Sequence, residues 1–467
     1  MNYSGLFEPI EIGDIKLCNR IAMAPMNMGY SAPMGFLSRD SLAWYAARSR
    51  GGFGLIFTEC VVVNSHPWRG CDSLNPALMT DQRYYRYLSS LAQMVHEIGD
   101  AKIFIQLSPG WGRQGHAAHE TPWIPAGAPS AVPMRIDYRN LNTKGWIRQY
   151  KRLVPDIDEI IANISEGELK RFEDFFDLPD EKYSAVWSKM QALVMEFLPE
   201  MKNYVMGETP RALEVEEVVE MEEQMARQAQ AAIRLGFDGV EIHSPHGYLI
   251  HSFLSSRSNK RMDRYGGSIE NRARFLINII EKTRAKIGPE KPLGARFSGD
   301  ECMPGGIDHE ESKAFAALAR DAGANFINIS QGCYENPAAF APHGEDEFVQ
   351  YGPGFKEATG LPVIAPGFIS PQKAEDAVAG GRIDIVSMGR QAIADPFWPA
   401  KVKSGREKDL VKCIRCNHCL MSLQEANWIT CKVNPTAGKE QIFPELWRTG
   451  STLEKKTNRF LEKVRGL

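Results

Sequence analysis

The sequence lacks long apolar runs and any marked excess of charge of one sign. Its 467 residues carry a formal net charge of −3, and no apolar run is long enough to cross a bilayer. The N-terminal segment MNYSGLFEPIEIGDIKL lacks the charged-then-apolar pattern of a secretion signal. These absences argue against a membrane protein and against nucleic acid as a partner. We therefore expect a soluble protein that works in the cytoplasm.

The sequence also lacks the cysteine pattern of a disulfide framework. Nine cysteines are an odd count, and most of the first five are widely separated along the chain. The remaining four are grouped as Cys413, Cys416, Cys419 and Cys431. Four thiolates bind either a tetrahedral zinc ion or an iron–sulfur cluster. Three close thiols and one distant thiol favour the cluster, because a zinc site usually joins two separate CxxC pairs.

Short apolar segments alternate with amphipathic segments along most of the chain. This alternation predicts an α/β fold, a parallel (β/α)8 TIM barrel entered through a hairpin in FEPIEIGDIKL. The active site of such a barrel is built from residues just after the strands, where Gln106, His243, Arg296 and Gln331 lie. The expected strands are residues 19–25, 54–58, 102–107, 239–243, 293–297, 326–330, 361–365 and 383–388.

One stretch, GVEIHSPHGYLIHSFL at residues 239–254, concentrates groups that suit acid–base chemistry. His243 falls where a buried strand ends, and His246 and Tyr248 follow within five residues. Two imidazoles and a phenol at the end of a strand suit the holding and protonating of an anionic oxygen or carbon. A single histidine here would be interpreted as a buried structural residue, but the three groups together predict a functional site.

Two later loops have the composition of a phosphate site. Gly367 follows the seventh expected strand, and Gly389 and Arg390 follow the eighth. Glycine allows backbone N–H groups to approach an anion, and an arginine neutralises it. Phosphate sites of TIM barrels recur after these two strands, so we favour a phosphate site over plain turns.

Taken in order, these motifs resemble the old yellow enzyme superfamily of FMN-dependent ene-reductases. The resemblance is to its iron–sulfur branch, which includes 2,4-dienoyl-CoA reductase, enoate reductase and trimethylamine dehydrogenase. The motifs that carry it are NRIAMAPM, IQL, GFDGVEIHSPHGYLIHSFLS, RYGGSIENRARF, ARFSGDE, IAPGFIS, MGRQAIADP and the cysteine group.

The resemblance implies a role for each site residue. Pro25 and Met26 would lie against a noncovalent FMN, with Ala24 offering backbone contacts. Gln106 would meet the pyrimidine edge of the flavin, Arg296 its N1 side, and Gly367, Gly389 and Arg390 its phosphate. His243 and His246 would hold the substrate's carbonyl oxygen, while hydride comes from FMN N5 and Tyr248 protonates the α-carbon.

The resemblance also implies an electron route. The four cysteines would hold a 4Fe–4S cluster that passes single electrons to FMN. In the family a C-terminal FAD and NAD(P)H module feeds that cluster, yet no GxGxxG motif behind a strand follows Cys431. We therefore expect a partner flavoprotein to supply electrons, or the sequence to be part of a longer chain.

Four segments are expected. Residues 1–400 would form the FMN-binding barrel and residues 401–440 the cluster-binding segment, with a tail at 441–467 that holds a basic helix. A helical insertion near residues 134–206 would follow the third strand, as a substrate lid or as a contact in a homo-oligomer. Its basic residues, among them Lys151, Arg152 and Arg171, would be either contacts for CoA phosphates or a solvated helix face.

Departures from the family pattern bear on the reaction. Asn27 stands near the place of the flavin-bound cysteine of trimethylamine dehydrogenase, and His243 stands where that enzyme has a tyrosine. Both favour a reductase of an enoyl or aryl substrate, such as a CoA thioester, over an amine dehydrogenase or oxidative demethylase. Tyr334 stands at about the position where dienoyl-CoA reductase has an active-site histidine, so it is a candidate second acid. An electron-transfer subunit, or a scaffold held by zinc, is the third alternative.

Overall fold

Eight parallel strands close into a barrel, as the sequence predicted. The computed structural model describes residues 3–31, 35–63, 82–114, 126–134, 151, 156–179, 182, 185–186, 189, 209–336, 344–345, 347–426 and 428–443. The barrel strands are β3 (Ile21–Met23), β4 (Leu55–Val62), β5 (Lys102–Ser108), β8 (Gly239–His243), β9 (Leu293–Ser298), β10 (Phe326–Ser330), β11 (Val363–Pro366) and β12 (Ile385–Met388). Each pairs with its neighbour in the chain order of the barrel, and β12 pairs with β3 to close the ring.

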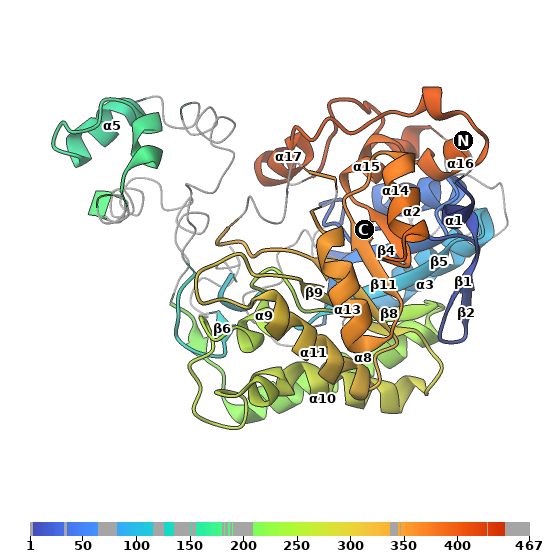
Figure 1. The fold of residues 1–467 in the computed structure, drawn as a ribbon, viewed down its shortest axis with the longest axis horizontal. Helices are drawn as coiled ribbons and strands as arrows, with labels where there is room; N and C mark the ends of the chain where they lie inside the picture. Colours follow the sequence, from blue (N-terminus) through green and yellow to red (C-terminus); the bar gives the residue numbers. More distant parts are fainter. Residues whose placement is uncertain are drawn as a thin grey trace.

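Helices surround the barrel and cover the outer faces of its strands (Figure 1). Those that follow the strands are α2 (Arg39–Arg50), α3 (Gln82–Ile98), α8 (Val215–Arg234), α10 (Ile269–Ile287), α11 (His309–Asp321), α13 (Gly352–Thr359) and α14 (Pro371–Ala379). Local sequence determines where several begin, because Ser268, Asp308 and Ser370 each accept a backbone N–H from the first turn of α10, α11 and α14. Among the described helices, none is long and apolar enough to span a bilayer.

The barrel interior changes from apolar to polar along the strands. Because every second residue of a strand faces inward, β5 contributes Phe104 and then Gln106, and β10 contributes Phe326 and then Asn328. The lower layer is an apolar cluster that includes Phe57, Phe104 and Phe326. The antiparallel hairpin of β1 (Ile10–Ile12) and β2 (Ile15–Leu17) adds Ile12 and Leu17 to that cluster.

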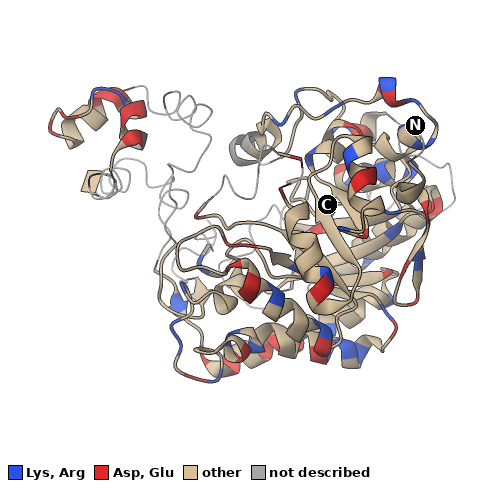
Figure 2. Cartoon of the chain, in the orientation of Figure 1, with Lys and Arg blue, Asp and Glu red and all other residues tan. Residues whose placement is uncertain are grey.

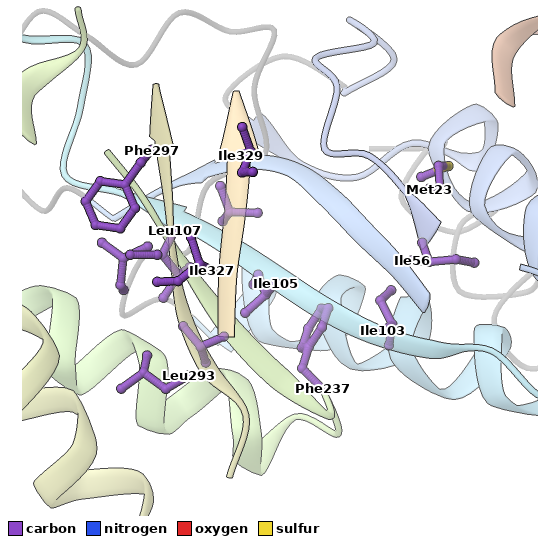
Figure 3. Close-up of a cluster of buried hydrophobic side chains, with 14 of the residues drawn as sticks. Met23, Ile56, Ile103, Ile105, Leu107, Phe237, Leu293, Phe297, Ile327 and Ile329 are labelled. Atoms are coloured by element: carbon purple, nitrogen blue, oxygen red, sulfur yellow. The ribbon is translucent and has the colours of Figure 1, made fainter. Parts of the chain in front are cut away.

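The outward-facing strand residues form a second, larger core with the helices. Ile103, Ile105 and Leu107 alternate along β5, and Ile327 and Ile329 along β10 (Figure 3). All five side chains are fully buried. Burying such a side chain contributes roughly 1.5–3 kcal/mol relative to leaving it exposed, so this layer secures the strands against the helices.

Strand β4 is longer than the sequence predicted. The pairing of β4 with β5 shifts between Phe57 and Cys60, where three steps along β4 match two along β5. The extra residue is a β-bulge, a feature common beside active sites. Thr58 lies in the bulge, and its Oγ1 accepts the backbone N–H of Gln106 at 3.0 Å.

The described part of the expected insertion has a small core of its own. The predicted helix appears as α5 (Ile157–Ile164), which Figure 1 shows to one side of the barrel. Residues 167–178 were expected to be helical but form only the short 3₁₀ helix η4 (Phe172–Asp177). Gly167, with a φ of 86°, and a bond from the Phe172 N–H to Asp158 shape a turn there instead. Ile157, Ile161, Phe172 and Phe175 pack together away from the barrel cores.

Several basic residues in the described part of this insertion are paired with nearby carboxylates. Lys151 Nζ lies 2.9 Å from both Asp158 and Glu173, and Arg171 lies 2.6 Å from Asp174. Figure 2 shows ribbon segments of acidic residues, in red, next to basic ones, in blue, around α5. These pairs favour the interpretation as a solvated face over that as a CoA phosphate site, and Arg152 lies outside the described residues.

Substituting Gly294 tests the packing of the lower barrel layer. A Cβ at this position would lie 2.5 Å from the Phe326 ring, so Gly294→Ala forces the ring to move. We expect the free energy of unfolding to fall by about 1–3 kcal/mol in urea denaturation. The double variant Gly294→Ala/Phe326→Leu should lose less free energy of unfolding than the two single variants lose together, because the smaller leucine side chain leaves room for the new methyl group. Additive losses would contradict this packing.

Candidate active site

The three acid–base residues of the motif lie together at the carboxyl end of β8. His243 is the last residue of the strand, and Tyr248 is the N-cap of α9 (Leu249–Leu254). Between them His246 has a φ of 68°, a left-handed conformation that histidine adopts at a cost of order 1–3 kcal/mol. This turn brings the ring centroids of His243 and His246 to 5.5 Å and those of His243 and Tyr248 to 5.0 Å.

Hydrogen bonds from the neighbouring loops hold two of these side chains. His246 Nε2 lies 2.6 Å from Ser330 Oγ at the end of β10, and Ser330 Oγ also accepts from Arg296 at 3.3 Å. The Tyr248 hydroxyl donates to the Tyr334 hydroxyl at 2.8 Å. Tyr334 therefore stands beside Tyr248, the arrangement that a second acid requires. The sequence showed neither Ser330 nor the aromatic contact of Tyr248 with Trp111, whose ring centroid lies 4.7 Å away.

His243 is buried with both ring nitrogens unpaired among the described residues. Its side chain is 4% exposed. A buried donor without a partner costs about 1–3 kcal/mol, so such a group in a native fold points to a ligand that completes it. Burial lowers the pKa of both His243 and His246 well below their usual value, and the Arg296 cation lowers both further. Both imidazoles are therefore neutral at pH 7.

A layer of polar side chains lies below these rings in the barrel. Gln106, Glu241 and Asn328 are buried, and Glu241 accepts from the Gln106 amide at 2.6 Å and from the Asn328 amide at 2.7 Å. Arg296 is 6% exposed, and its Nε has no partner in the described part of the chain. Glu241 was not recognised from the sequence, because a single acid within a strand carries no signal of its own.

The residues predicted to lie against the flavin ring follow β3. Pro25 and Met26 are half-buried, and a Cβ on Gly389 would lie 3.2 Å from Met26 Sδ. The loops after the first and eighth strands therefore touch. The Ala24 N–H donates to the Met388 carbonyl at 3.0 Å, which leaves only its carbonyl oxygen for a ligand.

The loops predicted to bind phosphate lie next to each other and to the cysteine segment. Gly389 is the N-cap of α15 (Arg390–Ala394), and Gly367 has a φ of 117° that favours glycine. Arg390 donates to Asn417 Oδ1 at 2.7 Å, and Arg415 donates to the Gly367 carbonyl at 3.0 Å. Each phosphate loop is thus bonded to the loop that carries the thiols.

The four cysteines are all unbridged and lie near one another. Cys413 receives a bond at its Sγ from the Arg415 N–H at 3.4 Å, and α17 (His418–Ala426) begins just before Cys419. Burial and, to a smaller extent, the Cys413 and Cys431 thiols raise the pKa of Cys419 to about 12, against the opposing effect of the Arg390 cation. Within the described chain, no three of these thiols have sulfurs within 4.8 Å of one another. A single zinc ion, with Zn–S near 2.3 Å, would draw them closer than that.

A buried ion-pair network joins the loops on the far side of the site. Glu335 accepts from Arg257 at 3.0 Å and from Arg113, while Glu301 accepts from Arg257 at 2.9 Å. This network holds the loop of Tyr334 in place. His116 and His119, which follow the third strand, lie outside the described residues.

This combination of barrel and loops defines a class of enzyme. The chain belongs to the NADH:flavin oxidoreductase / NADH oxidase family, whose model matches residues 5–158 and 180–409. It is therefore a flavin-dependent oxidoreductase of the old yellow enzyme type, as the sequence motifs predicted. The residues present fit FMN, because unpaired polar atoms of Arg296 and His243 and the glycines of two loops converge on the barrel mouth.

Individual relatives place it within this family. The chain is 32% identical to the NADH oxidase of Thermoanaerobacter brockii over 95% of this chain and 58% of that protein. It is 27% identical to the cinnamate reductase of Clostridium sporogenes over 94% and 59%. The solved structure of 2-naphthoyl-CoA reductase with 2-naphthoyl-CoA matches with a TM-score of 0.74 and 26% identity, over 94% of this chain and 58% of that one. Amine dehydrogenases are also among the similar proteins.

The chain spans little more than half the length of these relatives. What they act on is therefore not carried over to this chain by similarity alone. The expected division into barrel, insertion, cluster segment and tail stays a prediction, and so do the roles of the individual site residues.

Neutral buried histidines predict a particular loss of stability in acid. A histidine that stays uncharged in the folded state but has a pKa near 6.5 in the unfolded state does not change the free energy of unfolding above that pH. Below that pH it lowers the free energy of unfolding, because the unfolded state binds a proton that the folded state does not. At pH 5.5 the cost for His243 is about 1.4 kcal/mol. In urea denaturation at pH 7.5 and 5.5, His243→Asn should lose less stability than the wild type on acidification. An equal loss in both proteins would show that His243 is not held neutral.

Proposed function

We propose that the protein is an FMN- and 4Fe–4S-dependent ene-reductase. It reduces a C=C bond conjugated to a carbonyl, in an enoyl or aryl substrate such as a CoA thioester. The observation that supports this most is the pair of neutral imidazoles beside Tyr248, with both nitrogens of His243 buried and unpaired in the described chain. The named substrates of two relatives, cinnamate and 2-naphthoyl-CoA, are of this chemical class.

The chain's own residues perform two tasks in this reaction. N–H groups of His243 and His246 donate to the carbonyl oxygen, where negative charge develops, and Arg296 adds a nearby cation. The Tyr248 hydroxyl, which donates to Tyr334 at 2.8 Å in the free site, turns to the substrate and gives its proton to the α-carbon. The Tyr334 hydroxyl then donates to the phenolate oxygen left on Tyr248. FMN, when bound, supplies the hydride to the β-carbon.

The cysteine segment suits the entry of single electrons. Three of its thiols are close in sequence and the fourth is distant, a pattern that favours a cluster of several irons over one zinc ion. Cys416 is exposed, and beside the thiols Ile414 is 59% and Trp428 is 51% exposed. Exposed apolar side chains around an exposed thiol suit contact with an electron-donating flavoprotein, either as a partner subunit or as a further domain.

Tyr248→Phe tests the proton donor. The variant should keep FMN bound, while reoxidation of photoreduced enzyme by an enone or enoyl-CoA slows by about 10²–10⁴-fold, the usual contribution of a general acid. Stopped-flow absorbance under anaerobic conditions measures the rate. Tyr85→Phe is the matched control, because the Tyr85 hydroxyl contacts Gln228 on α8 and not the site. An unchanged rate in Tyr248→Phe would reject this role.

The same reduced enzyme distinguishes the alternatives. If amines reduce the flavin of the oxidised enzyme, and enones do not reoxidise the reduced enzyme, the result would favour an amine dehydrogenase. Enzyme that reacts with neither class would favour an electron-transfer subunit.

Cys416→Ser tests the cluster. Anaerobically reconstituted wild type should hold about four iron and four sulfide per chain with a broad visible absorption. Cys416→Ser should lose most of this iron, while Cys18→Ser, which removes an exposed thiol outside the segment, should retain it. A colourless wild type that takes up zinc and no iron would overturn the proposal of a cluster.

A further inference from the structure

A buried carboxylate beneath the site has no part in the reaction as described above. Glu241 is fully buried in the barrel and lies directly opposite Gln106 in the pairing of β5 with β8. Each of its two oxygens accepts a hydrogen bond from one amide: Oε1 from Gln106 at 2.6 Å and Oε2 from Asn328 at 2.7 Å. Asn328 belongs to β10, so Glu241 bridges strands that are separated by β9.

Glu241 lies within β8, and both of its amide partners lie on barrel strands. Its register partner on β9 is Gly294, whose open side is filled by the Phe326 ring of β10. The carboxylate is therefore placed by the barrel itself and not by a mobile loop.

An ionised carboxylate accepts hydrogen bonds and donates none. Glu241 therefore determines which end of each amide faces it, and the Gln106 NH2 group must point at Oε1. The other end of Gln106, its carbonyl oxygen, is then left to accept a hydrogen bond from a ligand. Without Glu241 the amide has no reason to prefer this orientation over the flipped one.

Two hydrogen bonds and one cation act on Glu241. Burial raises its pKa above the usual value, and the Arg296 cation and the hydrogen bonds from the Asn328 and Gln106 amides oppose that rise. The hydrogen-bond geometry points to the ionised form, because each oxygen accepts from an amide N–H. Glu241 in turn raises the pKa of Arg296 against burial. The two charges are buried together in the polar layer, so removing one leaves the other uncompensated.

We propose that Glu241 is a positioning residue for the flavin. It turns the Gln106 amide so that its carbonyl oxygen accepts from the N3–H of the isoalloxazine, and it offsets the Arg296 cation. This inference rests on the proposed FMN site but not on any substrate. It predicts that Glu241 acts on flavin affinity through Gln106 and on flavin reduction potential through its charge.

The test is a double-mutant cycle read out by FMN binding. Purified apoprotein is titrated with FMN by fluorescence quenching for the wild type, Glu241→Gln, Gln106→Ala and the double variant. Glu241→Gln should bind FMN roughly 10-fold more weakly, because its own amide cannot accept from both neighbours. In the Gln106→Ala background the same change should have little further effect.

Glu222→Gln is the matched control. Glu222 is also a buried acid, bonded to Tyr265 at 2.9 Å and to Asn278 at 2.8 Å, but it lies on α8 outside the barrel. This variant measures the general cost of neutralising a buried carboxylate, and its FMN affinity should equal that of the wild type. Equal weakening in Glu241→Gln and Glu222→Gln would overturn the proposal, as would wild-type affinity in Glu241→Gln.

A second variant separates the two effects and covers a failure of Glu241→Gln to fold. Glu241→Asp keeps the charge but is one methylene shorter, so it cannot reach both amides. It should weaken FMN binding and leave the FMN midpoint potential near that of the wild type, whereas Glu241→Gln should shift that potential upward. Unchanged FMN affinity in Glu241→Asp would overturn the proposal. A wild-type chain that binds no FMN would overturn the flavin site itself, which is a distinguishable result.

Discussion

Closing eight parallel strands around one axis forces alternate side chains of every strand into a narrow interior, and the site depends on how that interior is filled. Aromatic rings of Phe57, Phe104 and Phe326 fill the lower layer together with the hairpin. Polar groups placed above them must pair with one another, since water does not reach them. One carboxylate that accepts two amides satisfies part of this layer, while Arg296 Nε and Asn328 Oδ1 have no partner among the described residues.

The upper end of the barrel combines one cation with neutral donors. Arg296 lowers the pKa of both site histidines, and burial lowers it further, so neither imidazole carries a charge. A neutral imidazole still donates an N–H while leaving room for negative charge to develop on a ligand. The same low-dielectric setting makes an unpaired group costly, which is why the free nitrogens of His243 are informative.

Sequence reasoning succeeded where the signal is local. The strand bounds Gly239–His243 and Phe326–Ser330 agree with the structure, because runs of apolar residues between turn residues determine them. The motif HSPHGY also placed three chemical groups in one turn. The left-handed turn at His246 then brings their rings together, a detail that the spacing alone did not predict.

Sequence reasoning failed where the cause is a contact between distant segments. The extension of β4 comes from a bulge against β5, which no feature of LIFTECVV alone indicates. Glu241 has partners 135 and 87 residues away, and Arg390 is bonded to a residue 27 positions on. Such partners are visible only after the barrel has closed and the cysteine segment has folded back onto it.

The bonds of Asn417 to Arg390 and of Arg415 to Gly367 have a consequence for damage by air. Asn417 and Arg415 both adjoin Cys416, an exposed thiol. An oxidant that attacks this sulfur therefore acts one residue away from each of the two bonds that tether the glycine loops. With the proposed cluster and FMN in place, oxidation of Cys416 would therefore disturb both sites at once, and the cluster and the flavin would be lost together.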